Sequence, residues 1–353
     1  MSINTNDDSQ HSCSEPLTPP HMVETAKAVS LNLLPEKSKE RYILAYEKIL
    51  KWKKINKTKS WSENVLLTYF SNLSKEIKPS TLWSVYSMLK TTINMKHNIN
   101  IGTYPKLQAF LKRKSTGFKS KKSKVLTSTD IKKFIDEAPN IQYLVTKVVL
   151  IFGITGACRR EELSNITIND IQDFGSMLHI KLPYTKTNCS RSFTIEGEFY
   201  DIFKKYIDLR PANVQSDRFF LNYKNGKCTK QVIGKNKIGN MPKEIANYLN
   251  LPDPQAYTGH SFRRTSATLL ADSGGDITTL KRHGGWKSSQ IAEGYIEDSI
   301  NNKKKIFNQI TESITNPSST QTTNDVNYGA STSKASDVDE KKKKQVSAEM
   351  FSI

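Results

Sequence analysis

A strongly basic segment, from Lys112 to Lys124, divides the chain into two parts. Its thirteen residues carry seven Lys or Arg side chains and no acidic one, which is unsuited to an apolar core. We therefore predict a flexible basic linker over residues 112–125, with a separate domain on each side. The chain's 353 residues are sufficient for two domains with their own cores.

The hydrophobic pattern before this linker predicts only helices. Apolar side chains recur at helical spacing in three stripes, and a fourth short helix is predicted near Leu107 to Leu111. Ser60 and Glu63 have the spacing of a capping box before the second stripe. We predict a helical domain over residues 37–111, preceded by a disordered polar arm over residues 1–36. The three stripes are formed by Tyr42, Tyr46, Ile49 and Leu50, by Val65, Leu66, Tyr69, Phe70 and Leu73, and by Leu82, Val85, Leu89 and Ile93.

The pattern after the linker predicts a second domain over residues 126–312. An apolar helix is predicted through Leu144 to Ile154. Alternating apolar residues then predict two short strands, joined as a β-hairpin with Lys186 at or near its tip. Further helices are predicted from Glu198 to about Ile310, followed by a disordered polar tail over residues 313–353. The fold class is therefore mainly α with a small β-sheet or hairpin.

The net charge indicates the class of partner. With 53 Lys and Arg against 34 Asp and Glu, the chain carries +19 at neutral pH and attracts polyanions, with nucleic acid first among them. The longest apolar run, Val148 to Ile154, is far shorter than the ~20 residues that a membrane-spanning helix needs. The N-terminus lacks the pattern of a secretory signal, so we expect a reducing compartment and free thiols at all four cysteines. The cysteine and histidine spacing predicts no structural or catalytic metal.

Four residues of the second domain suit attack on a phosphodiester: His260, Arg263, Trp286 and Tyr295. Such chemistry needs a nucleophile, cations for the non-bridging oxygens and an acid for the leaving oxygen. Arg263 follows His260 by three residues, so one helix face would carry both, and its planar guanidinium can bind two phosphate oxygens. A second cation, Arg159, follows a glycine turn, with Glu162 three residues later. Taken singly, each of these residues also has an ordinary reading as a core or surface side chain.

In order and spacing, these elements resemble the motifs of the tyrosine recombinase (phage integrase) family over roughly residues 126–310. The helical domain before the linker resembles that family's core-binding domain, and the second domain its catalytic domain. The matching residues are Arg159 with Glu162 and Leu163 in the first arginine box, Lys186 in Thr-Lys-Thr of the hairpin, His260 and Arg263 in His-x-x-Arg, and Tyr295 as the nucleophile.

The resemblance implies a mechanism. Tyr295 would attack the scissile phosphate to form a 3′-phosphotyrosine and release a 5′-hydroxyl, while Arg159 and Arg263 hold the non-bridging oxygens. His260 would assist by hydrogen bonding and proton movement, and Lys186 would protonate the leaving oxygen. Because the covalent link conserves the bond energy, the resemblance implies neither ATP nor a divalent metal, and we expect no cofactor.

Trp286 departs from the family's commonest pattern, which has histidine nine residues before the tyrosine. Other members share this tryptophan, and the resemblance implies that its ring packs behind the tyrosine helix and donates its indole N–H to the phosphate. His283 has the wrong spacing for this role, and we predict that it lies on a helix surface. For Glu162 we expect a site-shaping role, with the capping of its own helix as the alternative.

The function that we expect is site-specific DNA strand exchange. The alternatives are a type IB topoisomerase, which nicks DNA by similar chemistry, and a catalytically silent DNA-binding protein descended from a recombinase. The expected partners are double-stranded DNA and further copies of the chain in a tetramer on DNA, with no membrane. The residues predicted to contact the DNA backbone are Lys112, Arg113, Lys114, Lys119, Lys121, Lys122 and Lys124.

Within the family, the Lys- and Asn-rich composition, the polar tails and the Gly-Gly-Trp variant look more similar to the eukaryotic mobile-element recombinases of the Crypton type than to bacterial chromosome-dimer resolvases. Such an origin implies a nuclear protein, whereas a prokaryotic host would place it in the cytoplasm or nucleoid. The cluster from Lys341 to Lys344 has the composition of a nuclear import signal, although a charge run this short is more often simply solvated.

Overall fold

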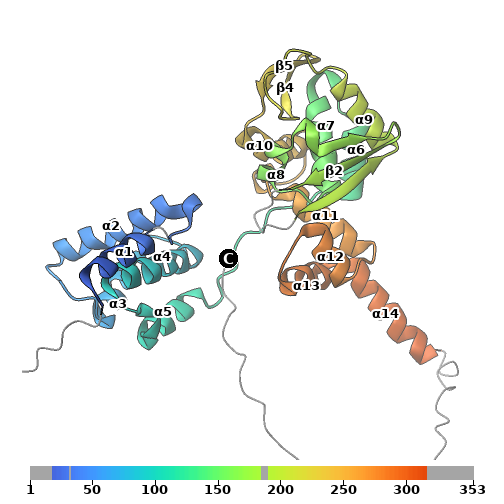
Figure 1. The fold of residues 1–353 in the computed structure, drawn as a ribbon. Helices are drawn as coiled ribbons and strands as arrows, with labels where there is room; N and C mark the ends of the chain where they lie inside the picture. The colour runs from blue at the N-terminus through green and yellow to red at the C-terminus, as the bar shows by residue number, and fades with distance from the viewer. Residues whose placement is uncertain (1–17, 32, 184–189, 316–353) are drawn as a thin grey trace, which may run out of the picture. The chain divides into compact units, whose positions relative to one another are not determined.

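The computed structural model describes residues 18–31, 33–183 and 190–315, which form two compact units (Figure 1). The first unit ends at Lys122 and the second begins at Ser123. Lys186, half of the predicted arm and nearly all of the predicted tail lie outside the described residues. In the described part of the arm, Pro20–Leu31 form helix α1, which packs on α4, so the prediction of disorder was wrong there. Proline suits this helix start because its fixed φ is already helical.

The regular secondary structure in the described part of the first unit is all helical. Side chains of the predicted stripes form its core, and Ile49, Leu66, Phe70 and Leu89 are fully buried. Its remaining helices are α2 (Lys39–Ile55), α3 (Glu63–Leu73), α4 (Pro79–His97) and α5 (Pro105–Ser115), with short 3-10 helices η1 (Glu36–Ser38) and η2 (Ile101–Thr103).

Glu63 does not form the predicted capping box with Ser60. It is the first residue of α3, and Ser62 is the N-cap. Its carboxylate instead accepts hydrogen bonds from the backbone N–H groups of Lys106 (2.6 Å) and Leu107 (3.1 Å), in the first turn of α5. The acid therefore caps a neighbouring helix, a long-range contact that sequence spacing does not reveal.

The linker between the two units is shorter than the predicted residues 112–125. Helix α5 continues through Lys112, Arg113 and Lys114 to Ser115, because its buried leucines hold it on the core and Trp83 Nε1 donates to Ser115 Oγ at 2.8 Å. At the other end, Lys124 belongs to the second unit. Its backbone N–H donates to Ala256 O at 2.9 Å and its Nζ donates to Pro252 O at 2.7 Å.

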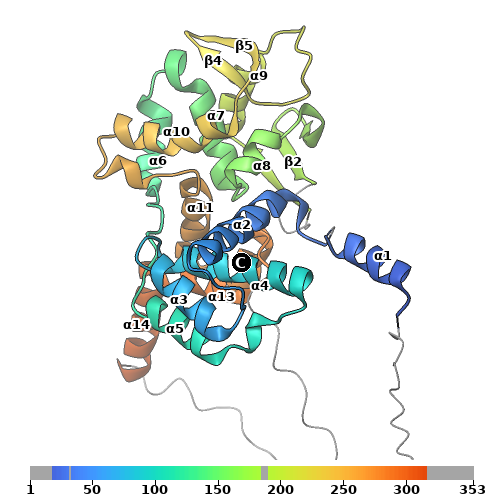
Figure 2. The same cartoon turned by 90° about the vertical axis from the view of Figure 1, so that its left-hand side faces the viewer.

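The second unit is built around helix α7 (Asn140–Thr155), which lies among its other helices (Figures 1 and 2). The residues of α7 from Leu144 to Gly153 are all buried. Helices α9 (Glu198–Ile207), α10 (Lys235–Tyr248) and α11 (Ser261–Asp272) pack against it, as does α8 (Arg160–Asn165). The unit opens with α6 (Ser128–Glu137), which begins at a capping box between Thr127 and Asp130. Its other helices are η3 (Ile168–Asp170), η4 (Pro254–Ala256), α12 (Ile277–Gly284), α13 (Ser289–Asp298) and α14 (Ile300–Thr315).

The predicted β-hairpin is confirmed as strands β2 (Met177–Leu182) and β3 (Arg191–Glu196), which pair antiparallel. Leu178 lies opposite Ile195, and both are buried, as the alternating pattern requires. A third strand, β1 (Ile171–Asp173), adds to the free edge of β2.

A second hairpin, β4 (Leu221–Lys224) with β5 (Lys227–Val232), was not predicted. The expectation that only helices follow Ile195 was therefore wrong. The turn between the strands is Asn225-Gly226, and both residues have positive φ, at 49° and 80°. Asn-Gly is a strong sequence signal for such a two-residue turn, but the flanking strands are too short to show a clear alternation.

Helices α11 to α13, with Trp286 between α12 and α13, form a separate small core. Ala267, Ala271, Leu280, Trp286 and Ala292 are its buried members. Helix α14 continues to Thr315, beyond the predicted end of the domain at residue 312. None of the helices in the described part of the chain is long and apolar enough to cross a membrane.

Candidate active site

The predicted first arginine box lies on a tight turn between α7 and α8. Gly156 ends α7, and a side chain there would collide with the ring of Phe193. Ala157 follows with φ of 43°, a left-handed conformation that costs energy for a residue with a Cβ. This geometry directs the Ala157 carbonyl toward two arginines of other segments, Arg191 and Arg263.

The Glu162 carboxylate joins two arginines and also caps its helix. It accepts from Arg159 Nη1 at 2.6 Å and from Arg191 Nη2 at 2.5 Å, and the Arg159 backbone N–H donates to it at 2.9 Å. Burial alone would raise its pKa, but the charges of Arg191 and Arg159 outweigh burial and hold the pKa below its usual value. Glu162 thus caps α8, the alternative role, and also links Arg159 to Arg191, while a role in shaping a catalytic site stays a prediction.

Arg263 is buried beside this pair, with 6% of its surface exposed. Its Nη1 donates to Ala157 O at 2.7 Å, its Nη2 donates to Gly284 O, and its guanidinium carbon lies 4.9 Å from the centre of the Trp286 ring. Burial, with the charges of Arg159 and Arg191, lowers its pKa to about 10, so it still carries its charge at neutral pH. Buried cations that lie this close to one another are well placed to bind an anion.

Tyr295 lies against the same cluster. Its ring stacks on Trp286 with centroids 5.4 Å apart and planes 20° apart, so the expected packing of the tryptophan is present. Trp286 is in turn fixed by two glycines that precede it. A Cβ at Gly284 would lie 2.6 Å from the indole ring, and Gly285 ends α12 with φ of 61°.

His283 is not on the helix surface, contrary to the prediction. Its ring Nε2 lies 2.7 Å from Ser266 Oγ, and its backbone carbonyl accepts from Arg191 Nη1 at 3.1 Å. Burial and the nearby charges of Arg191 and Arg263 lower its pKa to about 4, so the ring is neutral at pH 7. The prediction failed because sequence spacing does not show which side of α12 faces α11.

His260 is the N-cap of α11 and is exposed, three residues before the buried Arg263. It lies just outside the helix, so it does not share a helix face with Arg263 in the way predicted. Of the predicted site residues, the structure brings together Arg159, Glu162, Arg263, Trp286 and Tyr295, whereas Lys186 lies outside the described residues.

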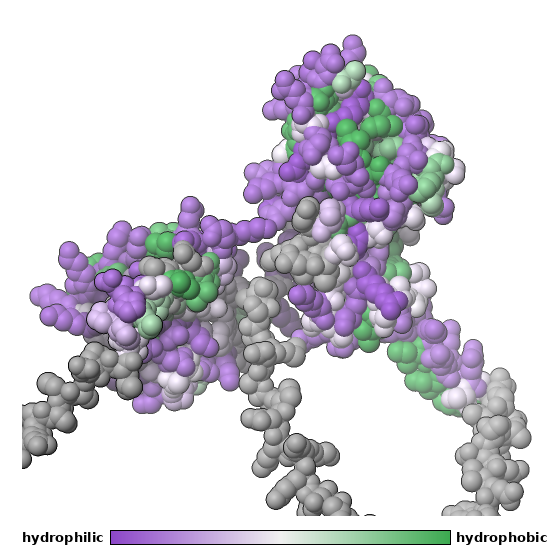
Figure 3. Space-filling view, viewed as in Figure 1, coloured by the Kyte–Doolittle hydropathy of each residue, from purple (hydrophilic) through white to green (hydrophobic). Residues whose placement is uncertain are grey.

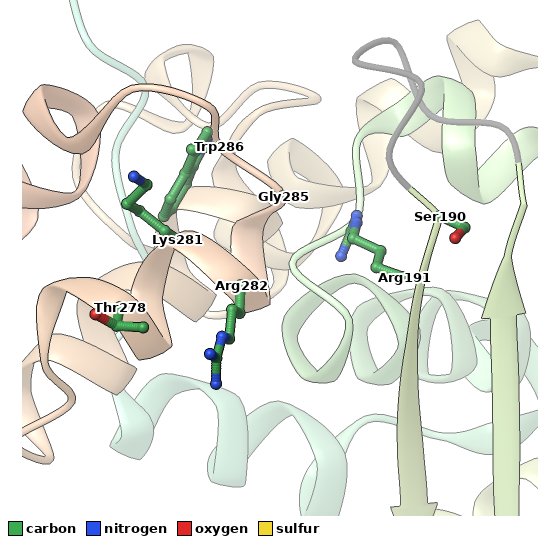
Figure 4. Close-up of a pocket in the computed structure, with 7 residues that line it drawn as sticks. All are labelled: Ser190, Arg191, Thr278, Lys281, Arg282, Gly285 and Trp286. Atoms are coloured by element: carbon green, nitrogen blue, oxygen red, sulfur yellow. The ribbon is translucent and has the colours of Figure 1, made fainter.

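A cleft of about 480 Å³ opens beside this cluster (Figure 4). Lys281, Arg282 and Trp286 line one side, and Ser190 and Arg191 line the other. Lys281 Nζ donates to Ser289 Oγ at 3.1 Å, which holds it beside α13. Within the described residues, no three His, Cys, Asp or Glu side chains lie close enough together to hold a metal ion. Lys281 and Arg282 give the cleft a positive charge, which favours a phosphate group.

Solved structures of tyrosine recombinases have this fold. XerH bound to a palindromic difH substrate is 16% identical, with 78% of this chain and 80% of that chain covered and a TM-score of 0.60. The Tn1549 transposon integrase bound to transposon right-end DNA is 15% identical, with 81% and 98% covered and a TM-score of 0.55. Lambda integrase bound to a COC′ core site is 14% identical, with 78% and 94% covered and a TM-score of 0.55. At such low identity these similarities show the fold alone.

The fold is thus that of the tyrosine recombinases. The model of the phage integrase family matches residues 124–302, just over half of the chain, and the protein belongs to that family. No curated protein sequence gives a significant match.

Proposed function

We propose that this protein is a site-specific recombinase that breaks and rejoins DNA through a covalent 3′-phosphotyrosine. The observation that carries the proposal is the stacking of Tyr295 on Trp286, whose ring also lies against the Arg263 guanidinium. A phenol in that position lies near Arg263, which in turn lies near Arg159, and both cations can bind the non-bridging oxygens of a phosphodiester.

In this mechanism Tyr295 attacks the phosphorus and the 5′-oxygen of the next nucleotide departs. Arg159 and Arg263 stabilise the negative charge that builds on the phosphate oxygens in the transition state. His260 assists proton movement, and Lys186 delivers the proton to the leaving oxygen. Because the phosphotyrosine conserves the energy of the broken bond, attack by a 5′-hydroxyl of another strand completes the exchange.

A covalent-adduct assay tests this proposal. The protein is incubated in EDTA with a suicide duplex, nicked beside the reactive phosphate and built on a binding site selected from a random DNA library. We expect wild type to form a covalent protein–DNA adduct and Tyr295→Phe to form none, because phenylalanine lacks the nucleophile. Tyr248→Phe is the matched control, since Tyr248 lies in an aromatic cluster with Phe134 and Tyr143, and it should react as wild type does.

The other outcomes identify the alternatives. Binding of the selected duplex without any adduct would indicate a catalytically silent DNA-binding protein. An adduct together with relaxation of supercoiled DNA, but no joining of two DNA molecules, would indicate a type IB topoisomerase. A Crypton-type origin and a nuclear location stay sequence-based predictions, and imaging of a fluorescent fusion in host cells would test the location.

We also propose that several copies assemble on DNA through helix α14. The helix contacts α11 and α13 and has no buried residue of its own, while its apolar side chains form an exposed stripe (Figure 3). A stripe at heptad and helical spacing is suited to packing on another protein surface. Its members are Ile300, Ile306, Phe307, Ile310 and Ile314, whose exposures are 67%, 47%, 66%, 55% and 71%.

A further inference from the structure

Arg191 is a buried cation that the proposed mechanism does not use. It is the first residue of β3, and only 8% of its side-chain surface is exposed. Its guanidinium contacts three separate segments: the turn after α7, the first turn of α8 and the end of α12. The acceptors are the Gly156, Ala157 and His283 carbonyls and the Glu162 carboxylate.

The same acceptors hold the two arginines that we assign to the phosphate. The Ala157 carbonyl accepts from Arg191 at 3.2 Å and from Arg263 at 2.7 Å. The Glu162 carboxylate accepts from Arg191 at 2.5 Å and from Arg159 at 2.6 Å. Arg191 also binds the carbonyl just before Gly284, whose own carbonyl accepts from Arg263. Arg191 thus shares a hydrogen-bond acceptor with each of the two arginines.

The hydrogen bonds of Arg191 leave its guanidinium unsuited to holding a phosphate itself. Nη1 donates to Gly156 and His283, and Nη2 donates to Ala157 and Glu162. The remaining donor, Nε, is buried and has no hydrogen-bond partner among the described residues. All four terminal N–H groups are therefore engaged by the protein, which is a pattern for holding backbone segments together.

We propose that Arg191 is a positioning residue for the strand-exchange chemistry. By joining the α7–α8 turn, Glu162 and the end of α12, it holds Arg159 and Arg263 in the arrangement that receives one phosphate. Lysine cannot replace it fully, because a single ammonium cannot reach acceptors on three segments in the way a planar fork does. This inference rests on the proposed function, and its test separates the two.

The test compares Arg191→Met and Arg191→Lys with wild type in two assays on the same library-selected duplex. The first measures the rate of adduct formation with saturating suicide duplex, and the second measures the Kd for the intact duplex. We expect Arg191→Met to react at least about 100-fold more slowly, since small misplacements of catalytic groups cost rates of that order, with Kd within about threefold. Arg191→Lys keeps the charge beside Glu162, so we expect an intermediate rate.

The matched control is Arg210→Met. Arg210 also donates to three backbone carbonyls, those of Ser216, Arg218 and Phe219, but it contacts none of the site residues. Circular dichroism measures the unfolding temperature of each variant, and all variants are assayed well below it. We expect Arg210→Met to lose stability and to keep the wild-type rate of adduct formation.

Each outcome decides between the proposals. Wild-type rates in Arg191→Met, or an equal loss of rate in Arg210→Met, would overturn the positioning role and leave the proposed function standing. If Arg191→Met does not fold, Arg191→Lys decides: a reduced rate with unchanged Kd supports the role, and a wild-type rate overturns it. Absence of an adduct with wild type would overturn the proposed function and this inference with it.

Discussion

The partly buried imidazole of His283 makes the stability of the second unit depend on pH. Its pKa is about 4 in the folded protein, against 6.5 for an exposed histidine, because burial and two arginines disfavour the charged form. As pH falls below 6.5, the unfolded chain takes up a proton at this site while the folded chain does not. The contribution of His283 to stability is therefore complete above pH 6.5 and is lost as pH falls toward 4.

Urea unfolding of wild type and His283→Gln between pH 7.5 and 4 measures this effect. We expect the wild type to lose roughly 2 kcal/mol more than the variant between pH 7.5 and 5, since each pKa unit corresponds to about 1.4 kcal/mol. Glutamine keeps a polar group for Ser266 but does not titrate. Parallel pH profiles for the two proteins would show that folding does not shift the pKa of His283.

The site residues that sequence reasoning could find are those with fixed spacing. Arg159 with Glu162, and Trp286 with Tyr295, are pairs whose distance along the chain carries information, and the structure brings them together. Arg191 has no such partner in sequence, because its contacts come from segments more than 25 residues away. A single arginine after a turn is therefore indistinguishable from a surface charge until the fold is known.

At the scale of elements, the two glycines on either side of Trp286 have opposite roles. A Cβ at Gly284 would lie 2.6 Å from the indole ring, whereas Gly294, inside α13, has nothing within 4 Å. We expect Gly284→Ala to destabilise the second unit by about 1–3 kcal/mol through overpacking. Gly294→Ala should instead stabilise it by up to about 1 kcal/mol, because alanine favours the helix.

Thermal unfolding of both variants checks this pair of expectations, with Trp286 fluorescence reporting the local packing. A loss of stability in Gly284→Ala that equals the change in Gly294→Ala would contradict the packing argument. Both substitutions add one methyl group to a helix, so only the surroundings distinguish them.

Elements with long periodic patterns were predictable, and short ones were not. In helix α7 and in the stripes of α2 to α4, enough apolar side chains recur at helical spacing for the helices to be predicted from the sequence. Strand β4 has only four residues, too few to show an alternating pattern. Its position is fixed by tertiary contacts: the Tyr206 hydroxyl binds the backbone of Leu221, and the carbonyl of the preceding Phe220 accepts from Ile233 N–H. Tertiary packing, which the local sequence does not contain, decides such elements.

At the scale of the whole molecule, the basic segment predicts a salt-dependent affinity for DNA. Lys119, Lys121 and Lys122 are exposed and lie between α5 and the second unit. If each contacts one phosphate, replacing all three by Gln should reduce the slope of log K against log salt by about 0.9 per residue, or roughly 3 in total. Binding titrations from 50 to 300 mM salt measure the slope, and an unchanged slope would exclude these contacts.

Assembly through α14 predicts a second effect at this scale. Removing residues from Ile300 onward, or introducing Phe307→Asp, should weaken the assembly of several copies on DNA while a single copy still binds. Lys304→Asp is a control on the same helix that changes charge without touching the apolar stripe. Analytical ultracentrifugation with the selected duplex distinguishes the species, and unchanged assembly in the truncated protein would exclude α14 as the contact.

The shared Glu162 carboxylate has a further consequence for the resting protein. Three guanidinium groups, those of Arg159, Arg191 and Arg263, lie around it, and their mutual repulsion contributes to the lowered pKa of Arg263. An anion that binds only the folded state relieves this repulsion and, by mass action, shifts the folding equilibrium toward the native form. Under the proposed function, DNA is a stabilising ligand of the second unit as well as its substrate, and we expect the protein to be most vulnerable to proteolysis between release and rebinding.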